Sequence, residues 1–455
     1  MSSVLSFEKK NNEVFCFGPG LFKKQESYSW NPDLEENPHL LVWGSSGAGK
    51  SYLLRELIAY LHGRKKHVHL VDLHGDLQTA GDNTMQFGGY QPGSKFGINP
   101  FQFDSSSPNA GPKTQLPIIV SMYRSTYLSN MGGIQELILK QICADTYLLA
   151  GIDKSVPATW MTEDIEEKTP SLESMLLLIE QIIEHFTGPK SLHKYLDSEL
   201  FNLKTLAKKH GEGHDLVNKQ HNDIIQNISN YIKNQCVEGA KDDPLLPVLK
   251  IDPRINLSAY KGKKALSTLE SIAMYTKALI ECDIFHSNPP PVRAGVVNRY
   301  NLQYIEDGVR KFFVEALVSK IFRAAQIRGE YRNRINPSRG QKVDTYIILD
   351  EIQSIMPSNN ADKNLPSQTY NRIASEARKY GLGLIVVTQS PGAFPTPMLS
   401  NITKRVGLKT NPIDIGDAKR KLGVAETALF NHLQRPQTAI VSNKSGGYDP
   451  VNVKR

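Results

Sequence analysis

The segment from Leu41 to Ser51 has the residue types and the spacing of a phosphate-binding loop. An apolar run is followed by Gly-x-x-x-x-Gly-Lys-Ser, the pattern of a P-loop. Its glycines let the backbone turn tightly, so that successive N–H groups point at an anion. Lys50 would then reach the β and γ phosphates of ATP, and the Ser51 hydroxyl would complete the shell of a magnesium ion. The sequence therefore predicts ATP and Mg²⁺ binding at Gly44, Ser45, Ser46, Gly47, Ala48, Gly49, Lys50, Ser51 and Tyr52.

A second segment, Thr345 to Glu351, is an apolar strand that ends in two acids. The Asp350 carboxylate would hold the magnesium shell, and Glu351 would polarise the water that attacks the γ phosphate. Many buried strands end in an acid, so the pattern is weak when it stands alone. In a chain that also carries a P-loop it predicts hydrolysis of the nucleotide rather than binding alone.

A third segment, Leu384 to Gln389, is predicted to be a core strand next in the sheet to the strand that ends in Asp350 and Glu351. The amide of Gln389 can hydrogen-bond both a phosphate oxygen and the attacking water. We therefore interpret Gln389 as a sensor of the γ phosphate. The alternative is an amide that caps the following turn at Ser390-Pro391.

The strand at 67–72 and the turn after it carry the histidines and acids His67, His69, Asp72, His74 and Asp76. Histidines two residues apart share a face of a strand, so a metal site is one interpretation, although no open-site ligand spacing is recognisable. The favoured interpretation is that Asp72 ends the strand beside the P-loop, where open α/β sheets place their ligands.

The order of elements predicts an α/β fold. Strand, helix and strand between residues 41 and 72 form a parallel βαβ unit, which needs helices on both faces of the sheet. Apolar residues at three- and four-residue spacing in 134–149, 172–186 and 223–232 predict helices with no strand between them. The predicted parts are a lead-in strand and loop at 1–38, a first core part at 39–114, an all-helical insertion at 115–255 and a second core part at 256–455.

Composition indicates a globular protein with an acidic partner. The 455 residues are 40% hydrophobic and 22% charged, and the formal net charge is +8. Such a charge favours nucleic acid as partner over an anionic membrane surface, although it also fits a merely solvated surface. Four scattered cysteines without a Cys-x-x-Cys pair predict neither a zinc site nor a disulfide framework. The N-terminal residues lack the apolar core of a signal peptide and no apolar run is long enough for a membrane span, so we expect a cytoplasmic protein.

The ordered set of motifs resembles the HerA–FtsK superfamily. It comprises the P-loop, Asp-Leu-His-Gly-Asp at 72–76, Asp-Glu-Ile-Gln at 350–353, Glu-Ala-Arg-Lys-Tyr-Gly at 376–381 and Thr-Gln-Ser-Pro at 388–391. Within the superfamily the chain is similar to the HerA helicases and to the motor domains of type IV secretion ATPases and conjugative coupling proteins. The resemblance covers about residues 39–110 and 285–442.

The resemblance implies a RecA-like P-loop NTPase core with a mainly parallel twisted sheet, working as a homo-oligomer, a hexameric ring that pumps DNA through a central channel. It keeps the roles given above for Lys50, Ser51, Asp350, Glu351 and Gln389. It also matches Arg378 to the arginine that reaches into the nucleotide of the neighbouring subunit. The alternative for Arg378 is a cation at the C-terminal end of its helix.

Three hypotheses for function stay open. The first is an ATPase that translocates double-stranded DNA, with backbone contacts from a loop at 356–368 and from Lys404-Arg405, and with a separate nuclease or effector as a possible partner. An arginine-rich segment at 328–342 is a phosphate contact or a surface loop. The second hypothesis is an ATPase that moves or switches a protein in secretion or conjugation. The third is a monomeric nucleotide switch.

Overall fold

The computed structural model describes most of the chain, in two compact units. The described residues are 14–21, 27–88, 96–106, 110–128, 131–187, 190–211, 214–236, 251–331, 343–355, 368–394, 396–435, 438–443 and 447–453. The first unit, which we call the sheet unit, comprises residues 1–132, 152–172 and 278–455, and the second, the helical unit, comprises 133–151 and 173–277. The candidate loops at 356–367 and 332–342 lie outside the described residues.

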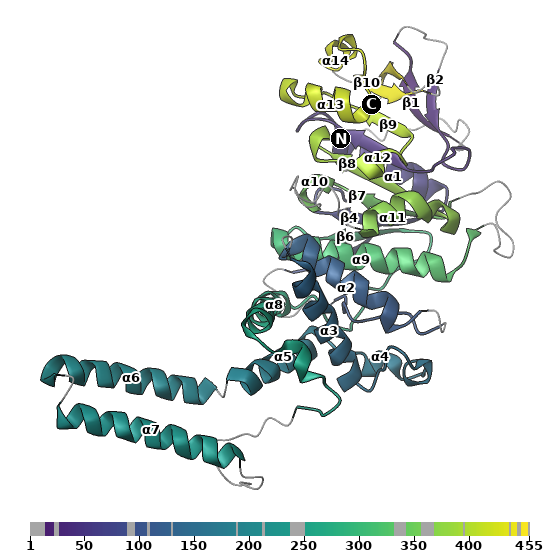
Figure 1. Ribbon diagram of the computed structural model, residues 1–455. Coiled ribbons are helices and arrows are strands. Elements are labelled where there is room, and N and C mark those ends of the chain that lie inside the picture. The colour runs from purple at the N-terminus through teal and green to yellow at the C-terminus, as the bar shows by residue number, and fades with distance from the viewer. Residues whose placement is uncertain are drawn as a thin grey trace. The chain divides into compact units, whose positions relative to one another are not determined.

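The sheet unit is built on a mainly parallel nine-stranded sheet, which confirms the predicted fold class (Figure 1). The strand order is β11-β10-β9-β3-β8-β7-β4-β6-β5. All strands from β9 to β5 run parallel, whereas β10 and β11 form an antiparallel edge. The strands are β3 (Leu40–Trp43), β4 (His67–Asp72), β5 (Asn83–Gln86), β6 (Val297–Asn301), β7 (Thr345–Leu349), β8 (Leu382–Thr388), β9 (Lys404–Gly407), β10 (Thr438–Ser442) and β11 (Tyr448–Asn452).

The central strands bring the three predicted motifs to one edge of the sheet. β8 lies between β3 and β7, with Trp43 opposite Thr388 and Leu349 opposite Val386. Because parallel strands end at the same edge, the P-loop, the Asp350-Glu351 pair and Gln389 all follow strands there. The strand of Gln389 is next to the strand of the acids, as the sequence predicts.

Asp72 is at this edge too, but it is not beside the P-loop. β4 pairs with β7 and β6, so that β7 and β8 separate it from β3. The buried Asp72 carboxylate accepts hydrogen bonds from the backbone N–H groups of Gly75 (2.8 Å) and Leu77 (3.1 Å) and pairs with Arg299 of β6 (2.7 Å). Its oxygens therefore stabilise the turn after β4 rather than face a ligand. The prediction that Asp72 lies beside the P-loop is wrong because strand order depends on contacts that local spacing does not encode.

One face of the sheet is covered by α1 (Lys50–Gly63), whose buried leucines and isoleucine pack on alternate residues of β3, β4, β7 and β8. A two-stranded sheet of β1 (Phe15–Pro19) and β2 (Ser27–Trp30) adds Phe17 and Trp30 to the same hydrophobic cluster. The predicted lead-in strand is therefore part of this core. Burial on both faces explains why β3, β7 and β8 are mainly apolar along their whole length.

The other face is covered by α9 (Asp307–Ile327), and α2 (Pro112–Thr126) packs along α9 (Figure 1). The ring centroids of Phe87 and Phe313 are 4.6 Å apart, and those of Tyr123 and Phe312 are 5.2 Å apart. The remaining helical elements of this unit are η1 (Pro157–Thr159), α4 (Ile165–Lys168), α10 (Ile352–Ile355), α11 (Gln368–Glu376), η5 (Ala377–Tyr380), η6 (Pro391–Ala393), α12 (Thr396–Leu399), η7 (Pro412–Asp414), α13 (Ile415–Leu422) and α14 (Ala428–His432).

The helical unit contains helices without a strand among its described residues. They are α3 (Gly133–Leu149), α5 (Leu172–Thr187), α6 (Lys190–His210), α7 (Asp215–Cys236), η2 (Leu257–Tyr260) and α8 (Lys263–Glu281). Tyr260 donates to Asp145 of α3 (2.6 Å), which ties η2 to α3. The unit starts later and ends later than the predicted segment 115–255, because α2 packs on α9 and α8 continues the helical run.

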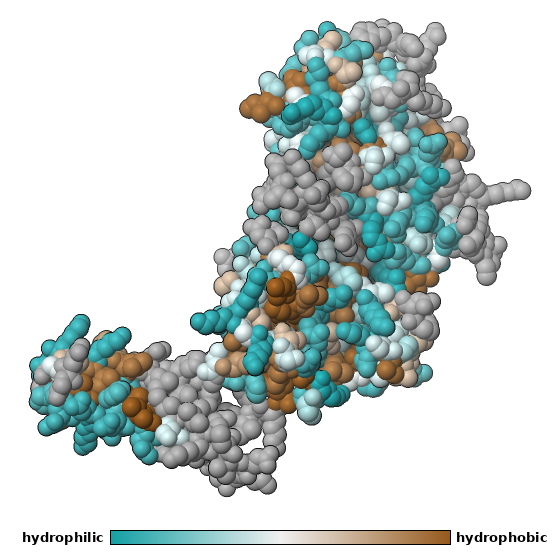
Figure 2. Space-filling model, viewed as in Figure 1, coloured by the Kyte–Doolittle hydropathy of each residue, from teal (hydrophilic) through white to brown (hydrophobic). Residues whose placement is uncertain are grey.

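Helices α6 and α7 lie side by side and expose large apolar side chains. Phe201 is 70% exposed and Ile225 is 51% exposed, and Figure 2 shows apolar patches on this pair. No helix in the described part of the chain is long and apolar enough to cross a membrane.

A buried histidine joins three elements near the start of the central strands. His39 Nδ1 accepts a hydrogen bond from the backbone N–H of Leu384 in β8 (3.0 Å), so Nε2 carries the proton and donates to the carbonyl of Ala374 in α11 (3.1 Å). Burial lowers the pKa of His39 to about 4, with a smaller contribution from the charge of Arg378. The neutral ring therefore fixes α11 to the sheet.

We expect the His39 contact to make the protein acid-sensitive. The folded pKa of about 4 lies below the ordinary value of 6.5, so the unfolded chain takes up the proton first as pH falls. The contribution of His39 to the free energy of unfolding is complete above pH 6.5 and falls by about 3 kcal/mol on going down to pH 4. Urea denaturation of wild type and His39→Gln across this range measures the difference.

The matched control is His62→Gln, which changes an exposed histidine of α1. Its unfolding free energy should follow that of wild type at every pH. A constant difference between wild type and His39→Gln over the same range would contradict the assignment of a buried neutral ring.

Candidate nucleotide-binding and catalytic site

The P-loop has the backbone that an anion cradle requires. Gly47 and Gly49 have φ of 73° and 96°, in the left-handed region that favours glycine, and a Cβ at either position would have no atom within 4 Å. Ser45 donates through both its backbone N–H (2.7 Å) and its hydroxyl (3.0 Å) to the carbonyl of Lys409, just beyond β9. The Gly44 N–H donates to the carbonyl of Thr388 (3.2 Å). The start of the loop is thereby fixed to the ends of β8 and β9.

Lys50 is buried at the first turn of α1 and lies in the field of two acids. Its Nζ donates to the carbonyl of Ser45 (3.0 Å), so the side chain folds back along the loop. Burial lowers the pKa of Lys50, and the charges of Asp350 and Glu351 oppose that shift. The structure thus places the lysine and both predicted acids in one cluster, at the edge where β3 and β7 end.

Asp350 is a buried carboxylate in negative surroundings. Burial raises its pKa to about 6, and the charges of Glu351, Asp76 and Asp72 add to the shift. One oxygen accepts from the backbone N–H of Glu351 (3.0 Å). A divalent cation stabilises the ionised form of such a group, so its chemistry fits the predicted magnesium ligand.

Glu351 combines an uncommon backbone conformation with two side-chain contacts. Its φ is 49°, which is uncommon for a residue other than glycine and costs of the order of 1 kcal/mol or more. One carboxylate oxygen lies 2.6 Å from Nε2 of His74, and the other accepts from the amide of Gln389. The hydrogen bond to Glu351 is the main reason why the pKa of His74 is raised. The structure therefore brings Glu351, Gln389 and His74 together.

The turn after β8 is capped by Thr388 and Gln353 rather than by Gln389. The Ser390 N–H donates to the Thr388 hydroxyl (3.1 Å), which in turn donates to the amide oxygen of Gln353 (2.9 Å). The side-chain amide of Gln389 is directed to Glu351 instead. This geometry fits the sensor interpretation better than the capping alternative.

Arg378 lies at the opposite edge of the sheet from the other site residues. It is exposed in η5, just before the seven residues of β8, whereas Gln389 comes just after them. At about 3.3 Å per residue, β8 alone separates the two edges by roughly 20 Å. The arginine therefore cannot reach a nucleotide held by Lys50 of the same chain.

The metal interpretation of the histidine-rich strand is wrong for the described residues, which contain no group of three or more potential ligands. His69 is buried and its Nδ1 pairs with the hydroxyl of Tyr300 (3.0 Å), while burial lowers its pKa to about 3. His67 accepts from the Gly295 N–H (3.1 Å). Sequence reasoning missed the contact of His74 with Glu351, although its position after a strand at the same sheet edge was a usable signal.

Family comparison agrees with this geometry. The family model described as "Helicase HerA, central domain" matches residues 35–107, which contain β3, the P-loop, α1 and β4. The chain is 27% identical over 118 residues to the DNA double-strand break repair helicase HerA of Sulfurisphaera tokodaii and 26% identical to that of Sulfolobus acidocaldarius. Each match covers 26% of this chain and 22% of the relative, so the chain spans about a fifth of the length of these proteins.

Solved structures share the fold over nearly the whole chain. VirB4 of Thermoanaerobacter pseudethanolicus aligns with a TM-score of 0.61 and 13% identity, over 99% of this chain and 98% of its own. The conjugative coupling protein TrwB aligns with a TM-score of 0.54 and 15% identity, over 98% and 90%. The chain is therefore similar to the HerA helicases over residues 35–107, and it shares the fold of VirB4 and TrwB over nearly its whole length. TrwB has also been solved with ADPNP and with ADP and Mg²⁺.

The P-loop has no room for a side chain at its first glycine. A Cβ on Gly44 would lie 2.8 Å from Cβ of Leu408 and 3.3 Å from the carbonyl oxygen of Lys409. We expect Gly44→Ala to lower the free energy of unfolding by about 1–3 kcal/mol and to weaken nucleotide binding, because the loop must shift. Thermal denaturation and titration with a fluorescent ATP analogue measure the two effects.

The matched control is Gly63→Ala at the end of α1, where a Cβ meets no atom within 4 Å. It should leave nucleotide binding unchanged and should be neutral or mildly stabilising. Wild-type behaviour of Gly44→Ala in both assays would show that β9 does not constrain the loop.

Proposed function

We propose that the protein is a ring-forming ATPase that couples ATP hydrolysis to translocation of double-stranded DNA through a central channel. The observation that supports a ring best is the separation of Arg378 from Lys50 and Glu351 across the sheet. The site of a single chain is incomplete if Arg378 acts on a nucleotide. A head-to-tail interface that places the amino edge of one sheet against the carboxyl edge of the next would complete it, and such contacts close into rings.

The residues of the cluster fit ATP and Mg²⁺. The backbone amides of the P-loop and Lys50 would hold the β and γ phosphates, and Ser51 with Asp350 would hold the metal. Bound magnesium would neutralise charge on the transferred phosphate. The two acids then keep Lys50 charged in a buried position, because their fields oppose the effect of burial on its pKa.

Glu351 is the base that we assign to the attacking water, with Gln389 as the link between base and γ phosphate. Both carboxylate oxygens of Glu351 already accept hydrogen bonds, from His74 and Gln389, which fixes their orientation. A water positioned by Glu351 and Gln389 would be aligned for attack. His74 acts through Glu351, as a positioning residue.

A mixing experiment tests the arginine in trans. Alone, Glu351→Gln should lower the ATP turnover rate by about 10²-fold or more, and Arg378→Ala by about 10³-fold. Mixed in equal amounts, the two inactive variants should recover activity, because about a quarter of head-to-tail interfaces then pair an intact Glu351 with an intact Arg378. The readout is steady-state phosphate release as a function of mixing ratio.

Lys379→Ala, which changes the exposed neighbour of Arg378, is the control and should keep wild-type turnover. If the two variants each bind ATP and still assemble, but ATP turnover does not recover on mixing, the proposal that Arg378 acts on the neighbouring subunit is contradicted. Unchanged hydrolysis in Arg378→Ala would favour the monomeric switch.

DNA as cargo rests on the matched HerA helicases and on the net charge of +8. The geometry argues against one of the predicted contacts to DNA phosphates, that of Arg405. The guanidinium of Arg405 donates to the carbonyls of Leu399 (2.6 Å), Ile402 (2.8 Å) and Leu422 (2.9 Å), so Arg405 stabilises the fold and is unsuited to a phosphate contact. A separate nuclease or effector chain would be a partner of the assembled motor.

Linear duplex DNA should stimulate ATP hydrolysis several-fold at low salt, and the stimulation should fade at high salt, because each phosphate contact releases condensed counterions. The measurement is phosphate release with and without DNA at two salt concentrations. Glu351→Gln supplies the background rate.

Robust hydrolysis that does not respond to DNA at either salt concentration would overturn DNA as cargo for this chain. That result would favour the alternative that the ATPase moves or switches a protein. Recovery in the mixing experiment would still stand, so the ring and its cargo are tested separately.

A further inference from the structure

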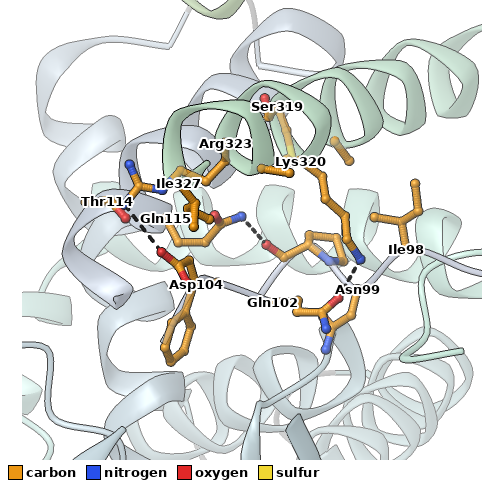
Figure 3. Close-up of a pocket in the computed structure, with 15 residues that line it drawn as sticks. Ile98, Asn99, Gln102, Asp104, Thr114, Gln115, Ser319, Lys320, Arg323 and Ile327 are labelled. Atoms are coloured by element: carbon orange, nitrogen blue, oxygen red, sulfur yellow. Dashed lines mark hydrogen bonds and ion pairs between the residues drawn. The ribbon is translucent and has the colours of Figure 1, made fainter. Parts of the chain in front are cut away.

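The sheet unit contains a cavity of about 210 Å³ that none of the proposed catalytic steps uses. It lies between the segment that follows Phe96, the first turns of α2 and the C-terminal half of α9 (Figure 3). Its lining consists of Ile98, Asn99, Pro100, Gln102, Phe103, Asp104, Thr114, Gln115, Met122, Ala316, Ser319, Lys320, Arg323, Ala324 and Ile327.

The lining combines two cations with amides and one acid. Figure 3 shows Lys320 and Arg323 extending from α9 toward Gln102 and Asp104. Lys320 Nζ donates to the side-chain oxygen of Gln102 (2.7 Å), and the amide of Gln115 donates to the carbonyl of Pro100 (2.7 Å). The amides are thus held in place, while the lysine has two further hydrogens for a guest.

Two buried polar atoms of opposite type lack a hydrogen-bond partner among the described residues. They are Oδ2 of Asp104, an acceptor, and Nε of Arg323, a donor. The other Asp104 oxygen accepts from the backbone N–H of Ser106 (2.9 Å). The nearest guanidinium nitrogen of Arg323 is 4.0 Å from Oδ2, too far for a hydrogen bond. Such atoms are rare in folded proteins, and an ordered water or a bound guest would satisfy them.

The size of the cavity limits that guest. Sites for larger ligands have volumes of about 300–1,000 Å³. A molecule of the size of an amino acid or a triose phosphate fits, whereas a nucleotide or a DNA strand does not.

We propose that this cavity binds a small organic anion that carries a hydrogen-bond donor next to its anionic group. Its carboxylate or phosphate oxygens lie on Lys320 and Arg323, and its hydroxyl or ammonium group donates to Asp104. The lining holds two cations and one carboxylate, which favours an anionic guest, and the charge of Glu166 also acts on Lys320. This binding site is independent of the proposed DNA translocation and of the P-loop.

Isothermal titration of the full chain with succinate, malate and aspartate tests the proposal, because these acids differ in one substituent: hydrogen, hydroxyl or ammonium. Glycerol 3-phosphate distinguishes a phosphate guest from a carboxylate guest. We expect saturable binding of one molecule of malate, aspartate or glycerol 3-phosphate per chain. Succinate should bind at least about tenfold more weakly than malate or aspartate, because it leaves Asp104 unpaired.

Variants locate the guest. Arg323→Gln and Lys320→Gln should each weaken binding at least about tenfold, and Asp104→Asn should remove the preference over succinate. Lys311→Gln, on the same helix but outside the lining, should leave binding unchanged. Lys50→Ala should also leave it unchanged, since that lysine belongs to the P-loop. Thermal denaturation verifies that each variant is folded. If Asp104→Asn does not fold, Lys320→Gln at an exposed position still tests the site.

Three results would overturn the proposal. The first is no saturable binding of any probe at millimolar concentration. The second is equal affinity for succinate and malate, which would mean that water satisfies the two buried atoms. The third is binding that Lys50→Ala abolishes and Arg323→Gln preserves, which would place the anion on the P-loop.

Discussion

The site depends on an unbalanced cluster of buried charges at the carboxyl edge of the sheet. The charges of Asp350 and Glu351 act on the pKa of Lys50, the charge of Glu351 acts on the pKa of Asp350, and burial opposes the charged form of both Lys50 and Asp350. Such a cluster is costly without a partner of complementary charge. Phosphates on the P-loop and a cation on Asp350 would supply that balance. The left-handed backbone of Glu351 lies at this same cluster.

The turn that carries the exposed Arg378 at the opposite edge follows a helix that is tied to the sheet. The helix is α11, which His39 ties to the sheet through the carbonyl of Ala374. Buried Glu315 of α9 accepts hydrogen bonds from Ser121 of α2 (2.5 Å) and Thr369 of α11 (3.4 Å). These polar contacts connect the helices of one face to the element that presents Arg378. If Arg378 acts on the nucleotide of a neighbouring copy, as proposed, these contacts would link hydrolysis to that neighbour.

Polar groups that face the sheet edges have different tasks although their sequence contexts look alike. Asp72 and Asp350 both lie at the carboxyl end of a parallel strand. The Asp72 carboxylate, however, is paired with an N–H group of its own turn and with Arg299. Arg378 and Arg405 are both basic residues close to strand starts, yet Arg405 donates to three carbonyls while Arg378 is exposed. The difference arises from how many donors or acceptors the surrounding backbone leaves unpaired.

The sequence by itself determined the P-loop, the acids at the end of β7, the α/β class and the helical character of the insertion. Each follows from local periodicity and from residue types at fixed spacing. Only the tertiary structure decided that β8 separates β3 from β7, that His74 contacts Glu351, and that Arg378 lies an entire strand away from Lys50. Strand order and side-chain partners depend on packing between segments hundreds of residues apart, and no local pattern encodes them.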